Sequence, residues 1–308
     1  MNHQFTAQSP PGMKNTPEQS ALIHRHHGSV EVIGLPAFDD NLIWVLKPHV
    51  IENTTRVPVT VVDPGDALPV IDFCRRHGLV PTDILLTHHH GDHTGGVSGL
   101  LEWMQQRYPE HPVRVFGPKI ESIPGVTHSL RGDELLTLGC SVAVSVLSVP
   151  GHTRGHLAFL MDSSPGVTPP ALFSGDLLFG LGCGRLFEGT AAQMHAALLS
   201  VSALPDNTRI YCAHEYTLLN LPFALHVDPH NTPLQLRAQE IRQLRQAGRS
   251  TLPLEMAVEK ATNPFLRADV AEVAAVVCPA SEMKSQEPTP ALEVFTRLRA
   301  LRDTFKAS

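Results

Sequence analysis

The sequence predicts an α/β fold followed by a smaller helical region. Short β-branched and apolar runs alternate with amphipathic stretches of helical period up to about residue 213. From Glu215 onward the patterns are helical alone. We therefore expect a disordered N-terminal extension at residues 1–28, an α/β domain at 29–214 and a helical domain at 215–308.

Each predicted strand is an apolar run bounded by turn residues. The first begins at Val30, and Asp63-Pro-Gly65 closes the third. The strands are expected at residues 30–35, 42–46, 58–62, 83–87, 113–116, 142–149, 157–161, 171–173 and 209–212. Helical patterns pass through residues 70–74, end near 107, and cover 190–204, 233–247 and 291–305.

Composition excludes several classes of function. The net charge of −6 gives no general attraction to nucleic acid or to a membrane surface. Five scattered cysteines without Cys-x-x-Cys spacing indicate reduced thiols. Residues 1–28, with His24, His26 and His27, read as a flexible polar tail, and no run reaches membrane-spanning length. We expect a cytoplasmic monomer without nucleic-acid or membrane partners.

The segment from Thr87 to His93 reads Thr-His-His-His-Gly-Asp-His and indicates a metal centre. Each of these polar side chains would need a partner once buried, and a bound cation supplies one to several at a time. The segment follows an apolar run that begins at Asp83, so it lies at the carboxyl end of a predicted strand.

Alternation along an extended chain places His88 and His90 on one face and His89 on the other. Gly91 then permits a turn. That turn can bring two further ligands into the same pocket, Asp92 and His93.

More distant ligands are expected at other strand ends. His152 follows a strongly apolar strand and a Pro-Gly turn, Asp176 follows Phe-Ser-Gly, and His214 ends the last predicted strand. Strand carboxyl ends converge in layered α/β folds, so these residues can meet the histidine cluster. The full set suits two divalent ions that share a carboxylate. Zinc fits this cysteine-free donor set, and iron and manganese fit it as well.

The order of these residues resembles the metallo-β-lactamase superfamily. The motif is His88-x-His90-x-Asp92-His93, followed by His152, Asp176 and His214. The resemblance implies an αβ/βα sandwich, with Asp63 supporting the site. It also implies two metal sites that share a bridging Asp176, one held by His88, His90 and His152 and the other by Asp92, His93 and His214.

Three further segments resemble glyoxalase II, the hydroxyacylglutathione hydrolase family. They are Gly182-Cys-Gly-Arg-Leu-Phe-Glu-Gly189, His214-Glu-Tyr-Thr217 and Arg299-Ala-Leu-Arg302-Asp-x-Phe-Lys306. The resemblance implies that glutathione is held by Arg185, Phe187, Tyr216, Arg299 and Arg302. Some members have lysine and tyrosine where this chain has Arg185 and Phe187, so the charge is kept and a phenolic hydrogen bond is lost.

The resemblance implies hydrolysis of S-(2-hydroxyacyl)glutathione thioesters. A hydroxide bridging two divalent ions would attack the thioester carbonyl, with Asp92 and Asp176 orienting it. The expected reaction converts S-D-lactoylglutathione to glutathione and D-lactate, in methylglyoxal detoxification.

Two alternatives stay open at this point. One is another enzyme of the same fold, such as a persulfide dioxygenase, a lactonase or a nuclease. The other is a non-catalytic metal-binding module. The complete ligand set disfavours the second alternative, and the net acidity disfavours a nuclease.

Overall fold

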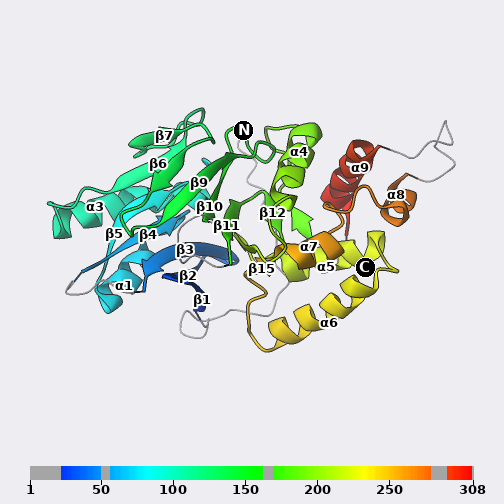
Figure 1. Cartoon of the computed structure of the whole chain (residues 1–308), viewed down its shortest axis with the longest axis horizontal. Coiled ribbons are helices and arrows are strands. Elements are labelled where there is room, and N and C mark those ends of the chain that lie inside the picture. Colours follow the sequence, from blue (N-terminus) through cyan, green and yellow to red (C-terminus); the bar gives the residue numbers. More distant parts are fainter. Residues whose placement is uncertain (1–21, 50–55, 162–168, 279–289, 307–308) are drawn as a thin grey trace.

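The computed structural model describes residues 22–49, 56–161, 169–278 and 290–306. Within these residues two sheets pack face to face (Figure 1). Alternation along β3 (Asn41–Pro48) shows how the layers form: Trp44 and Leu46 belong to the core between the sheets, whereas Ile43 and Val45 belong to a second core under two helices. Period-2 alternation thus buries both faces of the first sheet.

The first sheet has seven strands, which follow one another in chain order. They are β1 (Ile23–His27), β2 (Val30–Ala37), β3, β4 (Val57–Val62), β5 (Leu79–Leu85), β6 (Arg114–Pro118) and β7 (His128–Leu130). Strands β1 to β4 pair antiparallel with one another, and strands β4 to β7 pair parallel with one another.

The second sheet has six strands in the order β15-β14-β11-β10-β9-β8. They are β8 (Leu135–Thr137), β9 (Ala143–Ser148), β10 (Leu157–Met161), β11 (Ala171–Gly175), β14 (Arg209–Cys212) and β15 (Leu254–Glu255). Only β11 and β14 run parallel. A separate hairpin, β12 (Leu178–Phe179) with β13 (Gly182–Cys183), follows β11.

Helices cover the outer faces of both sheets. The helices α1 (Ala67–His77) and α3 (Val97–Arg107) contribute to the second core, on the outside of the first sheet. The helices α4 (Ala191–Ser202) and α9 (Ala291–Thr304) pack against each other and add buried residues to the core cluster that includes the space between the sheets. The remaining helices are α2 (Gly91–Thr94), α5 (Thr217–Val227), α6 (Thr232–Gln246), α7 (Met256–Thr262) and α8 (Ala271–Val277). The order of layers is therefore αβ/βα, as the resemblance implied.

The prediction of a disordered extension up to residue 28 was wrong for its last part. Ile23–His27 form β1, and Ile23 and His27 are buried. The His27 ring lies 2.6 Å from the Tyr211 hydroxyl and 2.5 Å from the Pro169 carbonyl oxygen. An edge strand with a polar outer row has too few apolar residues to show as a strand in sequence. Residues 1–21 lie outside the described residues.

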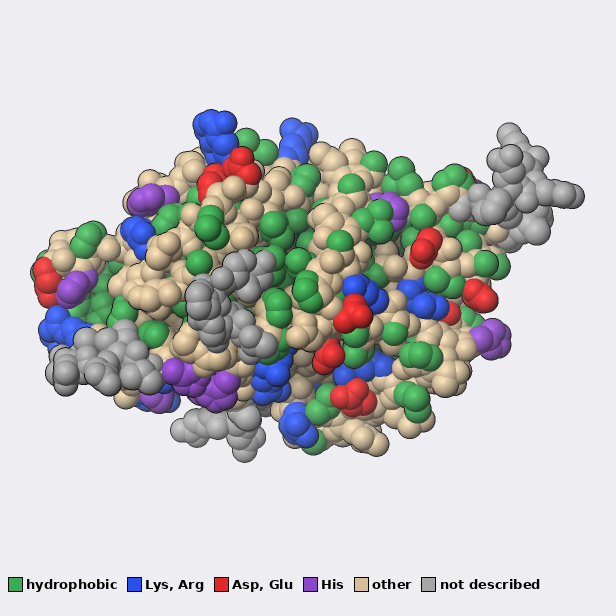
Figure 2. All heavy atoms as spheres, viewed as in Figure 1, with side chains coloured by type: hydrophobic (Ala, Val, Ile, Leu, Met, Phe, Trp, Pro, Cys, Tyr) green, Lys and Arg blue, Asp and Glu red, His purple; other side chains and the backbone are tan. Residues whose placement is uncertain are grey.

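Surface charge is mixed on the face that Figure 2 shows. Acidic and basic side chains lie among one another there, with apolar groups between them. This arrangement agrees with the small net charge of −6. None of the helices in the described part of the chain is long and apolar enough to cross a membrane.

Candidate metal centre

Four strand ends bring the candidate ligands together. Asp63 follows β4 and Thr87 lies just beyond β5, its parallel neighbour. Asp176 and His214 follow β11 and β14, the parallel pair of the second sheet. The Thr87 carbonyl accepts a hydrogen bond from Leu157 N at 2.8 Å, which joins the end of β5 to the start of β10 in the other sheet. The predicted convergence at strand carboxyl ends is therefore present.

His88, His90 and His152 form a first ligand group. His88 Nε2 and His152 Nε2 each lie 3.0 Å from His90 Nδ1. Burial lowers the pKa of all three rings, so they remain neutral imidazoles with free lone pairs. Three converging imidazole nitrogens are a typical donor set for a divalent transition metal.

Asp92, His93 and His214 form a second ligand group. Asp92 Oδ2 lies 3.6 Å from His93 Nε2 and 3.4 Å from His214 Nε2. Asp92 and His93 come from the short helix α2, which begins directly after His90. The turn at Gly91 thus lets one short segment supply ligands to both groups, as the sequence predicted.

Asp176 lies between the two groups. Its Oδ2 is 3.2 Å from His152 Nε2 in the first group. Its Oδ1 is 3.4 Å from both His93 Nε2 and His214 Nε2 in the second. Each carboxylate oxygen therefore faces a different group, which is the arrangement that a bridging ligand needs.

The donor set fits divalent cations. His93 Nε2 and Asp176 Oδ1 are buried and have no hydrogen-bond partner, a costly state that a bound ion relieves. Burial lowers the pKa of His214, but the Asp176 and Asp40 carboxylates outweigh it and raise that pKa to about 10. Without a cation this position holds a proton instead, so its potential favours positive charge.

The opposite ring nitrogens of the ligands are held by further partners. His93 Nδ1 lies 3.0 Å from Asp63 Oδ2, and His214 Nδ1 lies 2.7 Å from Asp40 Oδ1. Asn41 Nδ2 donates to Asp92 Oδ2 at 3.2 Å. Such partners fix the tautomer and orientation of a metal ligand. Asp63 was expected in this place, whereas sequence reasoning missed Asp40 and Asn41, whose only signal is a polar turn between two strands.

Two aromatic side chains predicted to bind substrate border the ligand groups. Phe187 is 63% exposed, and its ring makes edge contacts with His90 and His152 at centroid distances of 5.4 and 5.2 Å. Tyr216 stacks on His214 at 4.6 Å with the rings 7° from parallel. One ring therefore flanks each group.

The three predicted arginines differ in their environment. The Arg185 side chain is 61% exposed, and its Nε lies 3.7 Å from Asp303 Oδ1. Arg302 is half-buried and donates to Asn220 Oδ1 at 3.2 Å. Arg299 is only 5% exposed, and it donates to the Cys183 carbonyl at 3.0 Å and to Asp303 Oδ1 at 2.8 Å. The structure thus brings all three together around Asp303 and the β13 segment, with Arg299 innermost.

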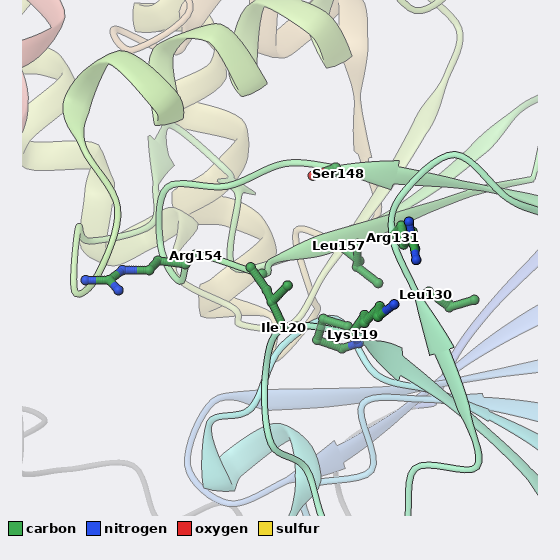
Figure 3. A pocket seen from close by; sticks show the side chains of 9 residues that line it. Lys119, Ile120, Leu130, Arg131, Ser148, Arg154 and Leu157 are labelled. Atoms are coloured by element: carbon green, nitrogen blue, oxygen red, sulfur yellow. The ribbon is translucent and has the colours of Figure 1, made fainter.

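A separate surface pocket of about 330 Å³ lies beyond β6 and β9. Figure 3 shows Lys119, Ile120 and Leu157 gathered there, while the Arg154 side chain extends away. None of the predicted site residues lines this pocket. The candidate site is therefore defined by the converging side chains and not by this hollow.

Two family models match the chain. The model described as "Metallo-beta-lactamase superfamily" matches residues 50–214. The model described as "Hydroxyacylglutathione hydrolase C-terminus" matches residues 215–305.

Curated relatives and solved structures give the same picture. The hydroxyacylglutathione hydrolase of Xanthomonas axonopodis pv. citri is 48% identical over 281 residues, covering 90% of this chain and 100% of the relative. That of Pseudomonas putida is 45% identical over 278 residues with the same coverage. A metallo-beta-lactamase from Staphylococcus aureus has a TM-score of 0.54 at 19% identity, covering 92% of this chain and 72% of that one. ETHE1 from Myxococcus xanthus has a TM-score of 0.51 at 20% identity, covering 93% and 92%.

The two structures support the fold alone, whereas the curated relatives match at high identity along almost their whole length. The chain therefore belongs to the metallo-beta-lactamase superfamily and, within it, to the hydroxyacylglutathione hydrolase family.

Proposed function

We propose that the chain hydrolyses S-(2-hydroxyacyl)glutathione thioesters, with S-D-lactoylglutathione giving glutathione and D-lactate. The observation that carries this proposal is the pair of ligand groups that share Asp176. Family membership adds the substrate class, because the curated relatives are named for this hydrolysis.

We assign one divalent ion to each ligand group and Asp176 to both. When bound, two such ions lower the pKa of water to near neutrality and polarise a carbonyl oxygen. The donors are nitrogen and oxygen only, which favours zinc, and iron and manganese accept the same set. The chain's own contribution is the fixed position of the donors, since Asp40, Asp63 and Asn41 hold them from behind.

Asp92 and Asp176 orient the attacking water in this proposal. Burial alone would raise the pKa of Asp176, but His214 and His93 hold it well below its usual range, so the carboxylate stays ionised. Asn41 fixes the Asp92 carboxylate through Nδ2. The leaving group is a thiol with a pKa of about 8.5, so it can depart as a thiolate without a general acid.

Glutathione would lie against the side chains around Phe187. Arg185 and Arg302 offer positive charge to the tripeptide carboxylates, and Tyr216 offers a hydroxyl beside the second ligand group. Burial, followed by the charges of Arg299 and Arg185, lowers the pKa of Arg302, which marks a place where cations are crowded. An incoming carboxylate relieves that crowding.

Arg299 has a different part in this proposal. Its guanidinium already donates to the Cys183 carbonyl and to Asp303, so its first effect is to hold the β13 segment beside Arg185. Its contribution to substrate binding is then largely indirect, through the position of that segment.

Zinc, a cytoplasmic location and a monomeric state belong to the same proposal. All five cysteines are buried thiols, which suits a reducing compartment. The monomer stays a prediction, which analytical ultracentrifugation of the metal-loaded protein would test.

The deciding experiment is a thioesterase assay on S-D-lactoylglutathione with elemental analysis of the same sample. We expect two metal equivalents per chain and release of free thiol, and no hydrolysis of a simple lactone or of a β-lactam at comparable concentration. Two bound metals without thiol release would refute the substrate assignment and leave the metal centre standing. A single equivalent in fully active protein would refute the shared role of Asp176.

A further inference from the structure

His89 is the one histidine of the Thr87–His93 cluster that the ligand groups do not use. Its ring lies between two carboxylates that come from different segments. Nδ1 is 3.0 Å from Glu121 Oε2, and Nε2 is 3.3 Å from Glu188 Oε1. The Glu121 side chain is 4% exposed, while those of His89 and Glu188 are about one-third exposed.

The other oxygen of each carboxylate binds the backbone of a third segment. Glu121 Oε1 accepts from Gly155 N at 2.8 Å. Glu188 Oε2 accepts from Arg154 N at 3.1 Å. A Cβ at Gly155 would lie 2.7 Å from the Glu121 Cγ, so the glycine permits this close approach. The ring therefore joins the segment after β6, the turn that carries His152 and the segment that carries Phe187.

One ligand atom from each of His89, Glu121 and Glu188 lies within 4.8 Å of the others, so the cluster offers two roles, a cation site or a link through the ring. The two carboxylates face different ring nitrogens, and one cation can bind only one of the two. Each ring nitrogen thus has its own carboxylate, at 3.0 and 3.3 Å. The arrangement is that of one ring held between two carboxylates from different segments.

The Glu188 end of this link is coupled to the substrate side. The backbone nitrogens of Phe187 and Glu188 donate to the His152 carbonyl at 3.2 and 3.3 Å. The Phe187 ring then rests on His90 and His152. The Glu188 side chain itself has two contacts, one with Arg154 N at 3.1 Å and one with the His89 ring at 3.3 Å. The second contact joins Glu188 to the Thr87–His93 turn.

We propose that His89 is a positioning residue that links the Arg185–Glu188 segment to the Thr87–His93 turn. Through this link it sets where the glutathione part of the substrate binds. This inference depends on the proposed function for its kinetic consequence. His89 belongs to neither of the two ligand groups, and its nitrogens face the two glutamates, while its ring packs edge-on against the His90 ring at 4.9 Å. Its loss is therefore expected to act on substrate binding and to leave the chemical step nearly intact.

The test compares His89→Gln and Glu188→Gln with the wild type in the metal-loaded protein. A glutamine at 89 can reach only one of the two carboxylates. We expect KM for S-D-lactoylglutathione to rise about tenfold, as loss of one contact to a carboxylate implies, with kcat within about twofold. Two metal equivalents should be retained. His111→Gln is the matched control, because His111 is an exposed histidine beside Glu110 at 3.6 Å, and its KM should not change.

Glu188→Gln guards against a folding defect, since it leaves the buried His89–Glu121 contact in place. It should raise KM by a similar factor. The double variant should be no worse than either single variant, because both remove the same link. Fully additive effects, or loss of metal from His89→Gln, would overturn the positioning role, as would a third metal equivalent in the wild type.

A readout independent of activity separates this inference from the proposed function. Amide hydrogen exchange of residues 185–189 should be faster in His89→Gln and in Glu188→Gln than in the wild type, and unchanged in His111→Gln. Exchange in α5 serves as the internal reference. Unchanged exchange at 185–189 refutes the link even if the enzyme is active. Faster exchange in the two variants, together with a wild type that does not hydrolyse the thioester, supports the link and refutes the proposed substrate.

Discussion

The ligand groups and the substrate-facing residues are held by the fold in opposite ways. His88, His93 and His214 are buried, and the second nitrogen of each ring has a close polar partner. Arg185 and Phe187 instead present most of their side chains to solvent. The metal side is thus fixed before anything binds, while the substrate side keeps freedom that a ligand must remove.

This difference explains which claims the sequence supports. Most of the ligands come from one turn and from residues directly after strands, so their grouping follows from local pattern. The substrate side depends on contacts between distant segments, such as the hydrogen bond from Arg299 to the Cys183 carbonyl. No local pattern reports a contact across 116 positions.

The largest effect is expected from removal of the ligand shared by the two metal-binding groups. Asp176→Ala removes the carboxylate that faces both ligand groups, and neighbouring side chains cannot replace it. We expect loss of at least one metal equivalent and a fall in kcat/KM of about 10³-fold or more. Elemental analysis and thioester kinetics on the same sample check this. Asp206→Ala, at an exposed pair with Lys260, is the control and should change neither. Retention of both metals would remove Asp176 as the shared ligand.

A second test concerns Glu259, which supports the hairpin between the two regions. Glu259 is fully buried, and its Oε2 accepts from Leu181 N at 2.9 Å and from Asn263 Nδ2 at 3.0 Å. Asn263 also donates to the carbonyls of Phe179 and Gly182. The hairpin lies between Asp176 and Arg185 in the chain. The buried Glu259 therefore supports both a metal ligand and a residue of the proposed substrate site.

The pH dependence of stability reveals the state of this carboxyl. Burial raises the pKa of Glu259 from 4.5 to about 7, so the folded protein holds the proton to higher pH than the unfolded chain. Its contribution to the free energy of unfolding therefore falls as pH rises from about 4.5 to 7, by up to about 3.5 kcal/mol at about 1.4 kcal/mol per pKa unit. Glu259→Gln should lessen this decline in urea unfolding at pH 5 and pH 8. An equal stability difference between variant and wild type at both pH values would contradict it.

Arg299→Ala sharpens the division between structural and binding arginines. It leaves the buried Cys183 carbonyl and part of Asp303 without a donor, so we expect a loss of about 2 kcal/mol in the free energy of unfolding. KM should rise as well, because the segment beside Arg185 loosens. Denaturant unfolding measures the first effect. Arg76→Ala on α1, which removes an exposed pair with Asp72 one turn away, should cost less than about 1 kcal/mol. Equal losses in the two variants would argue against a buried structural role.

The smallest effect is expected at Arg185. Arg185→Ala removes an exposed charge whose ion pair with Asp303 spans 3.7 Å, so the unfolding free energy should stay within about 0.5 kcal/mol of the wild type. KM should rise about fivefold with kcat unchanged, since the lost contact is made equally in ground and transition states. Arg131→Ala, an exposed arginine outside the site, provides the kinetic control. A fall in kcat at constant KM would place Arg185 in the chemical step instead.

Local sequence pattern predicted the main strands and the ligand positions. It missed two short strands and one residue that orients a ligand. The strand at 42–46 lies within β3, and the histidine cluster follows β5 as expected. β1 escaped prediction because its outward row is polar, and β15 because two residues carry no period. Asp40 escaped because its role depends on His214, far along the chain. Pairing between distant segments is the information that a single sequence lacks.

The short strand β15 bears on how such enzymes could be recombined. Leu254 and Glu255 pair with Ile210 and Arg209 of β14, and Met256 N donates to the Thr208 carbonyl at 2.9 Å. A hybrid made by joining two relatives at residue 214 would take this strand from one parent and its partner from the other. Crossovers placed after residue 256 would keep the pairing within one parent, so they should yield folded hybrids more often when new thioester specificities are sought.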